Sequence, residues 1–394
     1  MMFYIKSKSA ILGVVLTILK FGGLWCPSEF KGSFRKLYYV YSFMLFLFIL
    51  GSYMICQSVS LCQIWGNLPL MTNVACVLLT DTVQVIKMAN LLFKRNRIQR
   101  LIDDVEMVLT MPYGPEERNI ITTIEHALQR LTFFFVMLTY FTIGGWAGSA
   151  EKGQLPVLAW YPYDTTRYPA YALTYAHQIG SIYMSATLNM SKDMLAVTLI
   201  SLTGCRLQLV NYELRNFLND LEPDPETGLL TAAQEATAID RLRVCVRSHQ
   251  MALRAAKEIE ACFSLPIFAQ FSVSLCIICV TAFQLATIDN PMLFVAFLFY
   301  LFNMIYQVYI YCYQGNEIVE QSTSLVDAAY ASPWHRTSTA VRRRLLFLMM
   351  RSRKPVIIKA GGITTVTLQT FMAIVKTSYS LFTLLQDVED NQAN

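Results

Sequence analysis

Long runs of apolar residues separated by charged segments dominate the chain. Residues 37–80 contain no Asp, Glu, Lys or Arg, enough for two membrane-spanning helices of about 20 residues folded back at the "GNLP" turn at 66–69, with the second continuing to about residue 93. Five more spans follow at 131–150, 168–191, 261–288, 290–316 and 360–386. The pattern predicts an all-α membrane protein with seven transmembrane helices.

The overall composition agrees with this pattern, because 55% of the 394 residues are hydrophobic and only 15% are charged. The N-terminal apolar stretch at 10–19 has lysines before it, as a signal peptide would. However, Lys20 follows directly and no small-residue cleavage site comes after it. We therefore predict a short helix that dips into the membrane face.

The distribution of Lys and Arg predicts the orientation. These residues gather before the first span and in the loops after the second, fourth and sixth spans, whereas the alternate loops contain only Lys152 and Arg167. Loops rich in Lys and Arg stay in the cytoplasm. The N-terminus is therefore expected in the cytoplasm and the C-terminus outside the cell, the reverse of a G-protein-coupled receptor.

Two helices are predicted to project into the cytoplasm. After the turn-forming "PDPETG" at 223–228, seven residues recur at helical spacing and continue into the fifth span: Ile239, Leu242, Val246, His249, Leu253, Ala256 and Ile259. A second helix is expected at 339–351, before Pro355. Such helices indicate a packed anchor region beneath the membrane.

Motifs for catalysis or metal binding are not apparent. The chain has no HExxH, no GxSxG and no phosphate-binding glycine loop, and its four histidines do not pair at metal-ligand spacing. Cys276 and Cys279 lie one turn apart within an apolar span, where we interpret them as packing residues. We predict that the protein is not an enzyme and needs no metal or other cofactor.

Several motifs resemble the insect odorant receptor family. They are "YCYQGNEIVEQSTSLVDAAYASPW" at 311–334, "MMRSRKPVIIKAGG" at 349–362, "TFMAIVKTSYSLFTLL" at 370–385, "LPVLAWYPYD" at 155–164 and "EIEACFSLPIFAQFSVSLCIICV" at 258–280. The inverted seven-span topology is also that of the family. The cytoplasmic segment is shorter than that of the family's shared co-receptor, so the chain resembles an odorant-tuning subunit.

This resemblance implies a mechanism and partners. The chain would join the co-receptor in a heterotetrameric, ligand-gated, nonselective cation channel in the plasma membrane of olfactory sensory neuron dendrites. A small volatile organic ligand would bind in the outer half of the helix bundle and open a pore lined by the seventh helix. Membrane lipid and permeating cations are further expected partners, and nucleic acid is not.

The predicted organisation divides the chain as follows: 1–37 N-terminal cytoplasmic segment, 38–202 transmembrane helices 1–4 with the odorant site, 203–264 cytoplasmic anchor, 265–314 transmembrane helices 5–6, 315–359 cytoplasmic anchor, 360–386 pore helix and 387–394 extracellular tail.

The last span carries a polar stripe. Six residues fall within about 60° of one another at helical spacing: Thr365, Gln369, Lys376, Ser380, Thr383 and Asp387. Such a stripe faces protein or water, either as an inter-helix hydrogen-bonding seam or as the border of the pore. By resemblance to the end of the co-receptor, Leu384 and Val388 match an apolar gate and Asp387 a polar position. The pore and gate candidates are thus Ser380, Thr383, Leu384, Asp387 and Val388.

Lys376 lies about 15 Å from the outer end of this span, too deep to reach the outer surface. A lysine in the pore would repel cations. We expect it to turn into the helix bundle and to find a polar or acidic partner.

The ligand site is predicted from aromatic, apolar and small polar residues in the outer halves of spans two to five. The candidates are Val74, Leu78, Tyr140, Gly144, Gly145, Trp146, His177, Ser181, Met184, Phe283 and Thr287, with Trp160 and Tyr163 as an extracellular lid. Each Tyr, Trp and Met among them is individually better explained as ordinary packing than as a ligand contact. The two glycines could admit a ligand against bare backbone or simply let helices approach.

Two alternatives remain at this point. A gustatory-type channel would share the inverted topology, although "KTSYSLFTLL" at 376–385 favours the odorant family. A secondary transporter would need charged residues at the midplane and an inverted repeat. Charged residues are present in the spans, at Asp81, Lys87, Lys192, Asp193 and Lys376, but no inverted repeat is visible.

Overall fold

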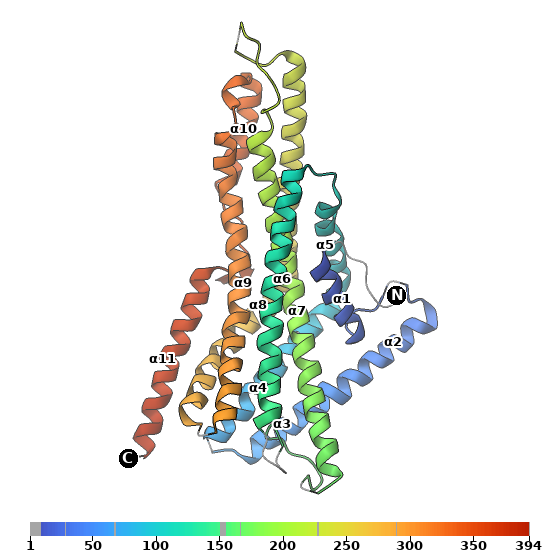
Figure 1. Cartoon of the computed structure of the whole chain (residues 1–394), viewed down its shortest axis with the longest axis vertical. Helices are drawn as coiled ribbons and strands as arrows, with labels where there is room; N and C mark the ends of the chain where they lie inside the picture. Colours follow the sequence, from blue (N-terminus) through green and yellow to red (C-terminus); the bar gives the residue numbers. More distant parts are fainter. Residues whose placement is uncertain are drawn as a thin grey trace.

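The computed structural model describes residues 9–27, 29–66, 68–149, 155–165, 167–226, 228–288 and 290–393, except the side chains of 68, 69 and 388–393. Nearly all of this chain is helical (Figure 1). Six described helical segments are long and apolar enough to cross a membrane: Gly32–Gln63, Leu70–Phe93, Pro115–Ser149, Ala170–Asn216, Ala232–Thr287 and Pro291–Ala331. These match the first six predicted spans.

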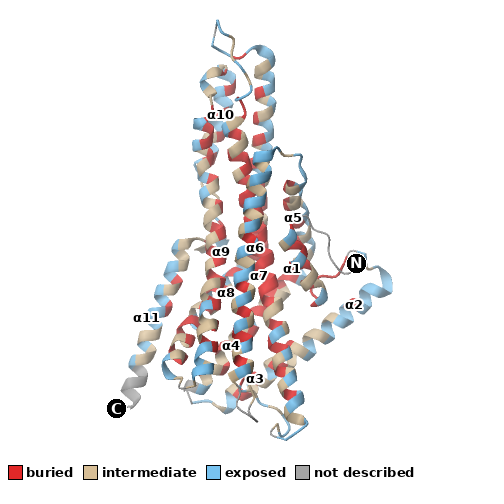
Figure 2. Cartoon of the chain, viewed as in Figure 1, coloured by how far each residue is buried: buried red, intermediate tan, exposed pale blue. Residues whose placement is uncertain are grey.

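The longest helices form a bundle around α7 (Ala170–Asn216), which packs against α6 (Pro115–Ser149), α8 (Ala232–Thr287) and α9 (Pro291–Ala331). In the most apolar window of α7, 94% of the residues are buried inside the chain itself (Figure 2). A helix so enclosed contacts protein rather than lipid, which allows it to carry polar residues.

The remaining elements surround this bundle. They are α1 (Ala10–Phe21), α2 (Gly32–Leu45), the π-helix η1 (Phe46–Gly51), α3 (Ser52–Gln63), α4 (Leu68–Phe93), α5 (Arg95–Met107), η2 (Val108–Thr110), η3 (Trp334–Arg336), α10 (Thr339–Ser352), β1 (Lys359–Ala360), β2 (Thr364–Thr365) and α11 (Leu368–Ala393). The predicted N-terminal helix is α1, and it packs on α7 through the buried Leu12, Val15 and Leu16.

The long helices continue beyond the lengths needed for membrane spans. Thr231 starts α8 with a capping box in which its side chain and that of Gln234 bond each other's backbone N–H. The predicted stripe lies on this helix, and its Leu242, His249 and Ile259 are buried. The expected boundaries at 203, 265 and 315 fall within α7, α8 and α9, so each span and its projecting segment form one helix.

The last helix begins later than predicted. Residues 359–365 form an antiparallel hairpin in which Lys359 pairs with Thr365 and Ala360 with Thr364. Gly361 and Gly362 supply the turn with φ of 61° and 74°, a conformation that glycine adopts readily and that helices do not contain. The expected start at residue 360 is therefore wrong, and Thr365 belongs to the hairpin rather than to the helical stripe.

The hairpin holds α11 against the bundle, while the rest of α11 diverges from it and is largely exposed (Figures 1 and 2). An added Cβ on Gly315 of α9 would lie 2.1 Å from the Val366 carbonyl oxygen, so only glycine permits this approach. Further along, the Ser378 hydroxyl donates to the Leu275 carbonyl of α8 at 3.0 Å.

Candidate ligand cavity

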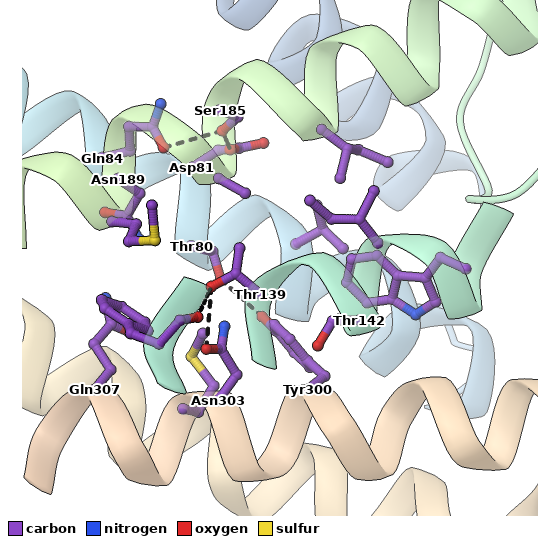
Figure 3. Close-up of a pocket in the computed structure, with 18 of the residues that line it drawn as sticks. Thr80, Asp81, Gln84, Thr139, Thr142, Ser185, Asn189, Tyr300, Asn303 and Gln307 are labelled. Atoms are coloured by element: carbon purple, nitrogen blue, oxygen red, sulfur yellow. Dashed lines mark hydrogen bonds between the residues drawn. The ribbon is translucent and has the colours of Figure 1, made fainter. Parts of the chain in front are cut away.

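A cavity lies inside the bundle, lined by residues of α4, α6, α7 and α9 and by Tyr53 of α3 (Figure 3). The space that the centre of a water-sized sphere can occupy inside it is about 70 Å³. This is several times the roughly 10–15 Å³ that one water molecule needs. It is lined by Tyr53, Val77, Thr80, Asp81, Gln84, Phe135, Thr139, Thr142, Ile143, Trp146, Ile182, Ser185, Ala186, Asn189, Met190, Tyr300, Asn303, Met304 and Gln307.

One part of the wall is aromatic. The Trp146 ring lies 5.1 Å from the Tyr300 ring and 6.2 Å from Phe297, measured between centroids. The Tyr300 hydroxyl lies 2.8 Å from the Thr80 hydroxyl. This hydrogen bond ties α9 to α4 and keeps the ring against the cavity, where it offers a flat apolar surface.

Another part of the wall is polar. The Ser185 hydroxyl of α7 lies 2.8 Å from Asp81 Oδ1 and 3.0 Å from Gln84 Oε1, both on α4. On the side of α6 and α9, the Thr139 hydroxyl donates to Asn303 Oδ1 at 3.3 Å. Figure 3 shows these polar groups on different helices around the cavity. A ligand would therefore meet both an aromatic wall and hydrogen-bonding groups.

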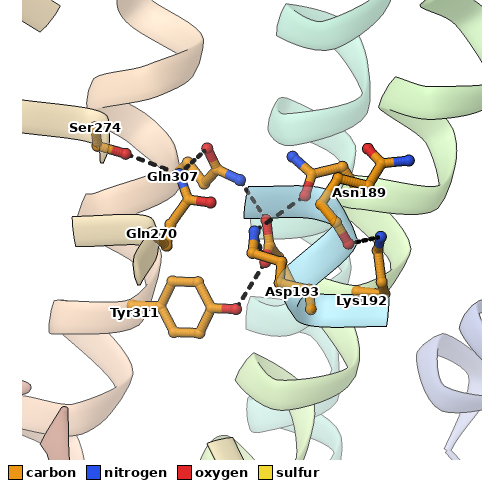
Figure 4. Close-up of polar contacts among 9 residues, drawn as sticks. Asn189, Lys192, Asp193, Gln270, Ser274, Gln307 and Tyr311 are labelled. Carbon is orange, nitrogen blue, oxygen red and sulfur yellow. Dashed lines mark hydrogen bonds and ion pairs between the residues drawn. The ribbon is translucent and has the colours of Figure 1, made fainter. Parts of the chain in front are cut away.

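A charged network adjoins the polar wall (Figure 4). The Lys87 ammonium of α4 lies 2.5 Å from Asp193 Oδ1 of α7, and the two side chains are 3% and 0% exposed. Asp193 also accepts hydrogen bonds from Gln307 and from the Tyr311 hydroxyl, the latter at 2.8 Å. Lys87 donates to Asn189 Oδ1 at 3.0 Å as well. Charged side chains buried away from water are tolerated only when they are paired and hydrogen-bonded. These contacts link α4, α7 and α9.

The network reaches the cavity through shared residues, because Asn189 and Gln307 also line it. Gln270 of α8 donates to Gln307 Oε1 at 2.8 Å. The Lys192 ammonium lies 3.2 Å from the Gln84 carbonyl oxygen. Changes in the cavity wall are thus coupled by direct contacts to α4, α7, α8 and α9.

Of the predicted ligand contacts, Trp146 lines this cavity. The others lie outside its lining: Val74, Leu78, Tyr140, Gly144, Gly145, His177, Ser181, Met184, Phe283 and Thr287. On α4 and α7 the lining begins among the chosen stretches, at Val77 and Ile182, and continues one to two helical turns further along the chain. That these residues contact a ligand stays a prediction.

The packing explains several of these positions. Phe283 is fully buried on α8, which does not contribute to the lining. Gly145 packs against Ala296, since an added Cβ would come within 2.8 Å of the Ala296 Cβ. His177 Nε2 lies 3.2 Å from the Ser52 hydroxyl, and the Tyr140 hydroxyl lies 3.2 Å from that of Thr187.

The predicted lid residues, Trp160 and Tyr163, are exposed in the loop before α7. The Trp160 backbone N–H donates to the Cys56 carbonyl at 3.2 Å, and the Tyr163 hydroxyl lies 2.9 Å from the Thr174 hydroxyl. The loop is thus fixed to α3 and α7 without forming part of the cavity lining.

The predicted pore residues lie on the free half of α11. Ser380, Leu384 and Asp387 are exposed and Thr383 is half-exposed, whereas Val388 lies outside the side chains that the structure describes. Lys376 is also exposed on α11, so the expectation that it turns into the bundle of its own chain is wrong. The residues that face the bundle are instead Ile374 and Ser378.

Sequence reasoning did not include α9 in the site, although this helix provides Tyr300, Asn303, Met304 and Gln307. The available signal was the pair of amides in an otherwise apolar span, because polar groups in a membrane helix face protein or water. Asp81 was noticed only as a charged residue and not as part of a ligand site.

The fold is that of a helical membrane protein whose bundle encloses a cavity with aromatic and polar walls. A family model described as "7tm Odorant receptor" matches residues 67–379, and the chain belongs to this family. The relatives are receptors rather than enzymes, in agreement with the sequence analysis.

Two curated relatives cover nearly the whole chain. Odorant receptor Or1 of Anopheles gambiae is 27% identical, with 95% of this chain and 94% of the relative covered. Odorant receptor 13a of Drosophila melanogaster is 22% identical over 98% of both.

A solved structure has the same fold. The insect olfactory receptor OR5 from Machilis hrabei, in complex with eugenol, superposes with a TM-score of 0.81 at 19% identity, covering 96% of this chain and 97% of that one. A second structure of OR5 from Machilis hrabei superposes with a TM-score of 0.79.

Proposed function

We propose that this chain is the odorant-binding subunit of a heteromeric, ligand-gated, nonselective cation channel. The observation that carries the proposal is the cavity enclosed by α4, α6, α7 and α9, with aromatic and polar walls, in a chain of the odorant receptor family. A small volatile organic molecule occupies this cavity. The OR5 structure that shares this fold is a complex with eugenol, a small aromatic molecule.

In this proposal α11 is the seventh transmembrane helix and lines the pore. Its exposed side contains Lys376, Ser380 and Asp387, which a single chain leaves uncovered. Association with the family's co-receptor in a tetramer would cover part of this side and turn the remainder to the pore. Thr383, Leu384, Asp387 and Val388 then lie nearest the gate, and an acidic side chain there favours cations.

The proposed orientation has the N-terminus and α10 in the cytoplasm and the C-terminus outside, because Lys and Arg concentrate before the first span and in the segments after the second, fourth and sixth spans. The projecting parts of α7, α8 and α9 then form the cytoplasmic anchor with α10. The location would be the plasma membrane of olfactory sensory neuron dendrites.

The test is whole-cell recording from cells that express this chain, the co-receptor, or both, under a panel of small aromatic, ester and alcohol odorants. Odorant-evoked cation current only in the pair supports the proposal. Current from this chain alone means a self-sufficient channel, and saturable uptake without channel-sized current supports a transporter.

A matched pair of variants on α7 tests the cavity. Ala186→Phe places a ring in the cavity and is expected to abolish the odorant response without loss of surface expression, since Ala186 lines it. Leu173→Phe, at a position 69% exposed, should respond as the unmodified chain does. Equal responses from the two variants would remove this cavity as the odorant site.

A further inference from the structure

Asp81 of α4 has an unusual environment for a carboxylate. It lines the cavity and is only 3% exposed. Its Oδ1 accepts a hydrogen bond from Ser185 at 2.8 Å, whereas its buried Oδ2 has no hydrogen-bond partner in the described part of the chain. We propose that Asp81 accepts a hydrogen bond from the hydroxyl group of an alcohol or phenol odorant, an inference that rests on the cavity being the odorant site.

The lysines nearest in the network are engaged elsewhere. Lys87 forms its ion pair with Asp193 and also bonds Asn189. Lys192 donates to the backbone carbonyl of Gln84. Asp81 therefore has a short contact with Ser185 and no direct ion pair among the described residues. Because buried polar groups are nearly always hydrogen-bonded, an oxygen in this position indicates a donor supplied from outside the chain.

Tyr53 narrows the chemical class of the ligand. Its ring lines the same cavity and the residue is fully buried. Its hydroxyl lies near the buried Gln57 amide but makes no hydrogen bond of ordinary geometry within the described residues. A hydroxyl group is both a donor and an acceptor. One ligand hydroxyl can therefore donate to Asp81 Oδ2 and accept from Tyr53, whereas an ether or ester oxygen can only accept and a hydrocarbon can do neither.

A neutral donor fits better than a protonated amine. The buried network contains two acidic side chains, Asp81 and Asp193, and two basic ones, Lys87 and Lys192, so its formal charge is balanced. An ammonium ligand would add a further charge to this site and lose its own hydration, which costs far more than the transfer of a hydroxyl. The ring of an aromatic alcohol would lie against Trp146 and Tyr300.

The experiment compares three compounds of similar size: 2-phenylethanol, its methyl ether and propylbenzene. Responses of the channel formed with the co-receptor and thermal stabilisation of the purified complex are measured for each. The unmodified receptor should prefer the alcohol to the ether by about tenfold to a hundredfold, the range expected for a buried hydrogen bond to a charged group.

Two variants separate donor recognition from general damage. Asp81→Asn should lower the sensitivity to the alcohol by about tenfold or more and leave propylbenzene unchanged. Tyr53→Phe should weaken the alcohol and the ether alike, since both can accept from its hydroxyl. Ile182→Val, which trims an apolar cavity residue, should affect the three compounds equally.

The outcomes are distinct. Equal sensitivity to alcohol and ether in the unmodified receptor, or equal losses for all three compounds in Asp81→Asn, would overturn the inference and leave the cavity as an odorant site. If none of the compounds produced current or stabilised the complex, the proposed odorant site would itself fail, and the inference with it.

Discussion

Substitution of Lys87 should show how much the charged network contributes to the stability of the folded chain. In Lys87→Met the Asp193 carboxylate stays 0% exposed and keeps its bonds from Gln307 and Tyr311, but it loses its only ion-pair partner within the described chain. Loss of one partner from a buried pair costs about 3–5 kcal/mol. This magnitude is a large part of the stability of an average protein.

A double variant removes the charges of both Lys87 and Asp193. In Lys87→Met/Asp193→Asn both members of the ion pair become neutral, and the asparagine carbonyl replaces one of the two carboxylate oxygens that accept from Gln307 and Tyr311. We expect this double variant to be more stable than the single one and to lie within about 1–2 kcal/mol of the unmodified chain, because neutral replacements of buried pairs are often tolerated.

Arg97 and Glu258 provide the control. Their side chains are also 2.5 Å apart, but each is 43% exposed. Exposed pairs contribute about 0–1 kcal/mol, so Arg97→Met should hardly change stability. The measurement is the melting temperature of the detergent-solubilised receptor, followed by fluorescence-detected size-exclusion chromatography. The reasoning would be refuted if Lys87→Met had the same melting temperature as the Arg97→Met control, or if the double variant had the lowest melting temperature of the three.

Three further predictions concern packing and capping. Gly145→Ala should lower the melting temperature because its Cβ would strike α9, whereas its neighbour Gly144→Ala should not, since nothing lies within 4 Å of the added atom. Gly315→Ala should displace the hairpin at Val366 and reduce current at normal surface expression, as measured by surface biotinylation and recording. Thr231→Ala should destabilise the start of α8 by about 1 kcal/mol, seen as faster amide hydrogen exchange there.

The helices could be predicted from the sequence because charge-free runs and helical spacing are local properties. The continuation of the stripe into the fifth span followed from periodicity, and the helix at 339–351 was expected to end before Pro355. The start of the last helix could not be obtained in this way. Gly361 and Gly362 hardly change the hydropathy of the apolar run, so the run appears continuous in the sequence. Their positive φ values nevertheless form the turn of a hairpin, and α11 begins only at Leu368.

The cavity was harder to predict, because it depends on which faces of four helices converge. Trp146 was identified from its type and depth, but Asn303 and Gln307 contribute only because α9 turns them toward α4 and α7. Lys376 illustrates the opposite problem. A charged residue in an apolar helix suggested burial, whereas α11 diverges from the bundle and leaves that side uncovered.

The enclosure of α7 also has a consequence for biosynthesis. This helix brings Lys192 and Asp193 into the membrane, and each charge costs roughly 2.5–3.5 kcal/mol when a helix is inserted alone. Lys87 lies on α4, which leaves the ribosome earlier, whereas Gln307 and Tyr311 lie on α9 and are made later. The nascent chain can therefore form the Lys87–Asp193 pair before α9 exists, so that α4 acts as a docking partner during insertion of the most enclosed helix.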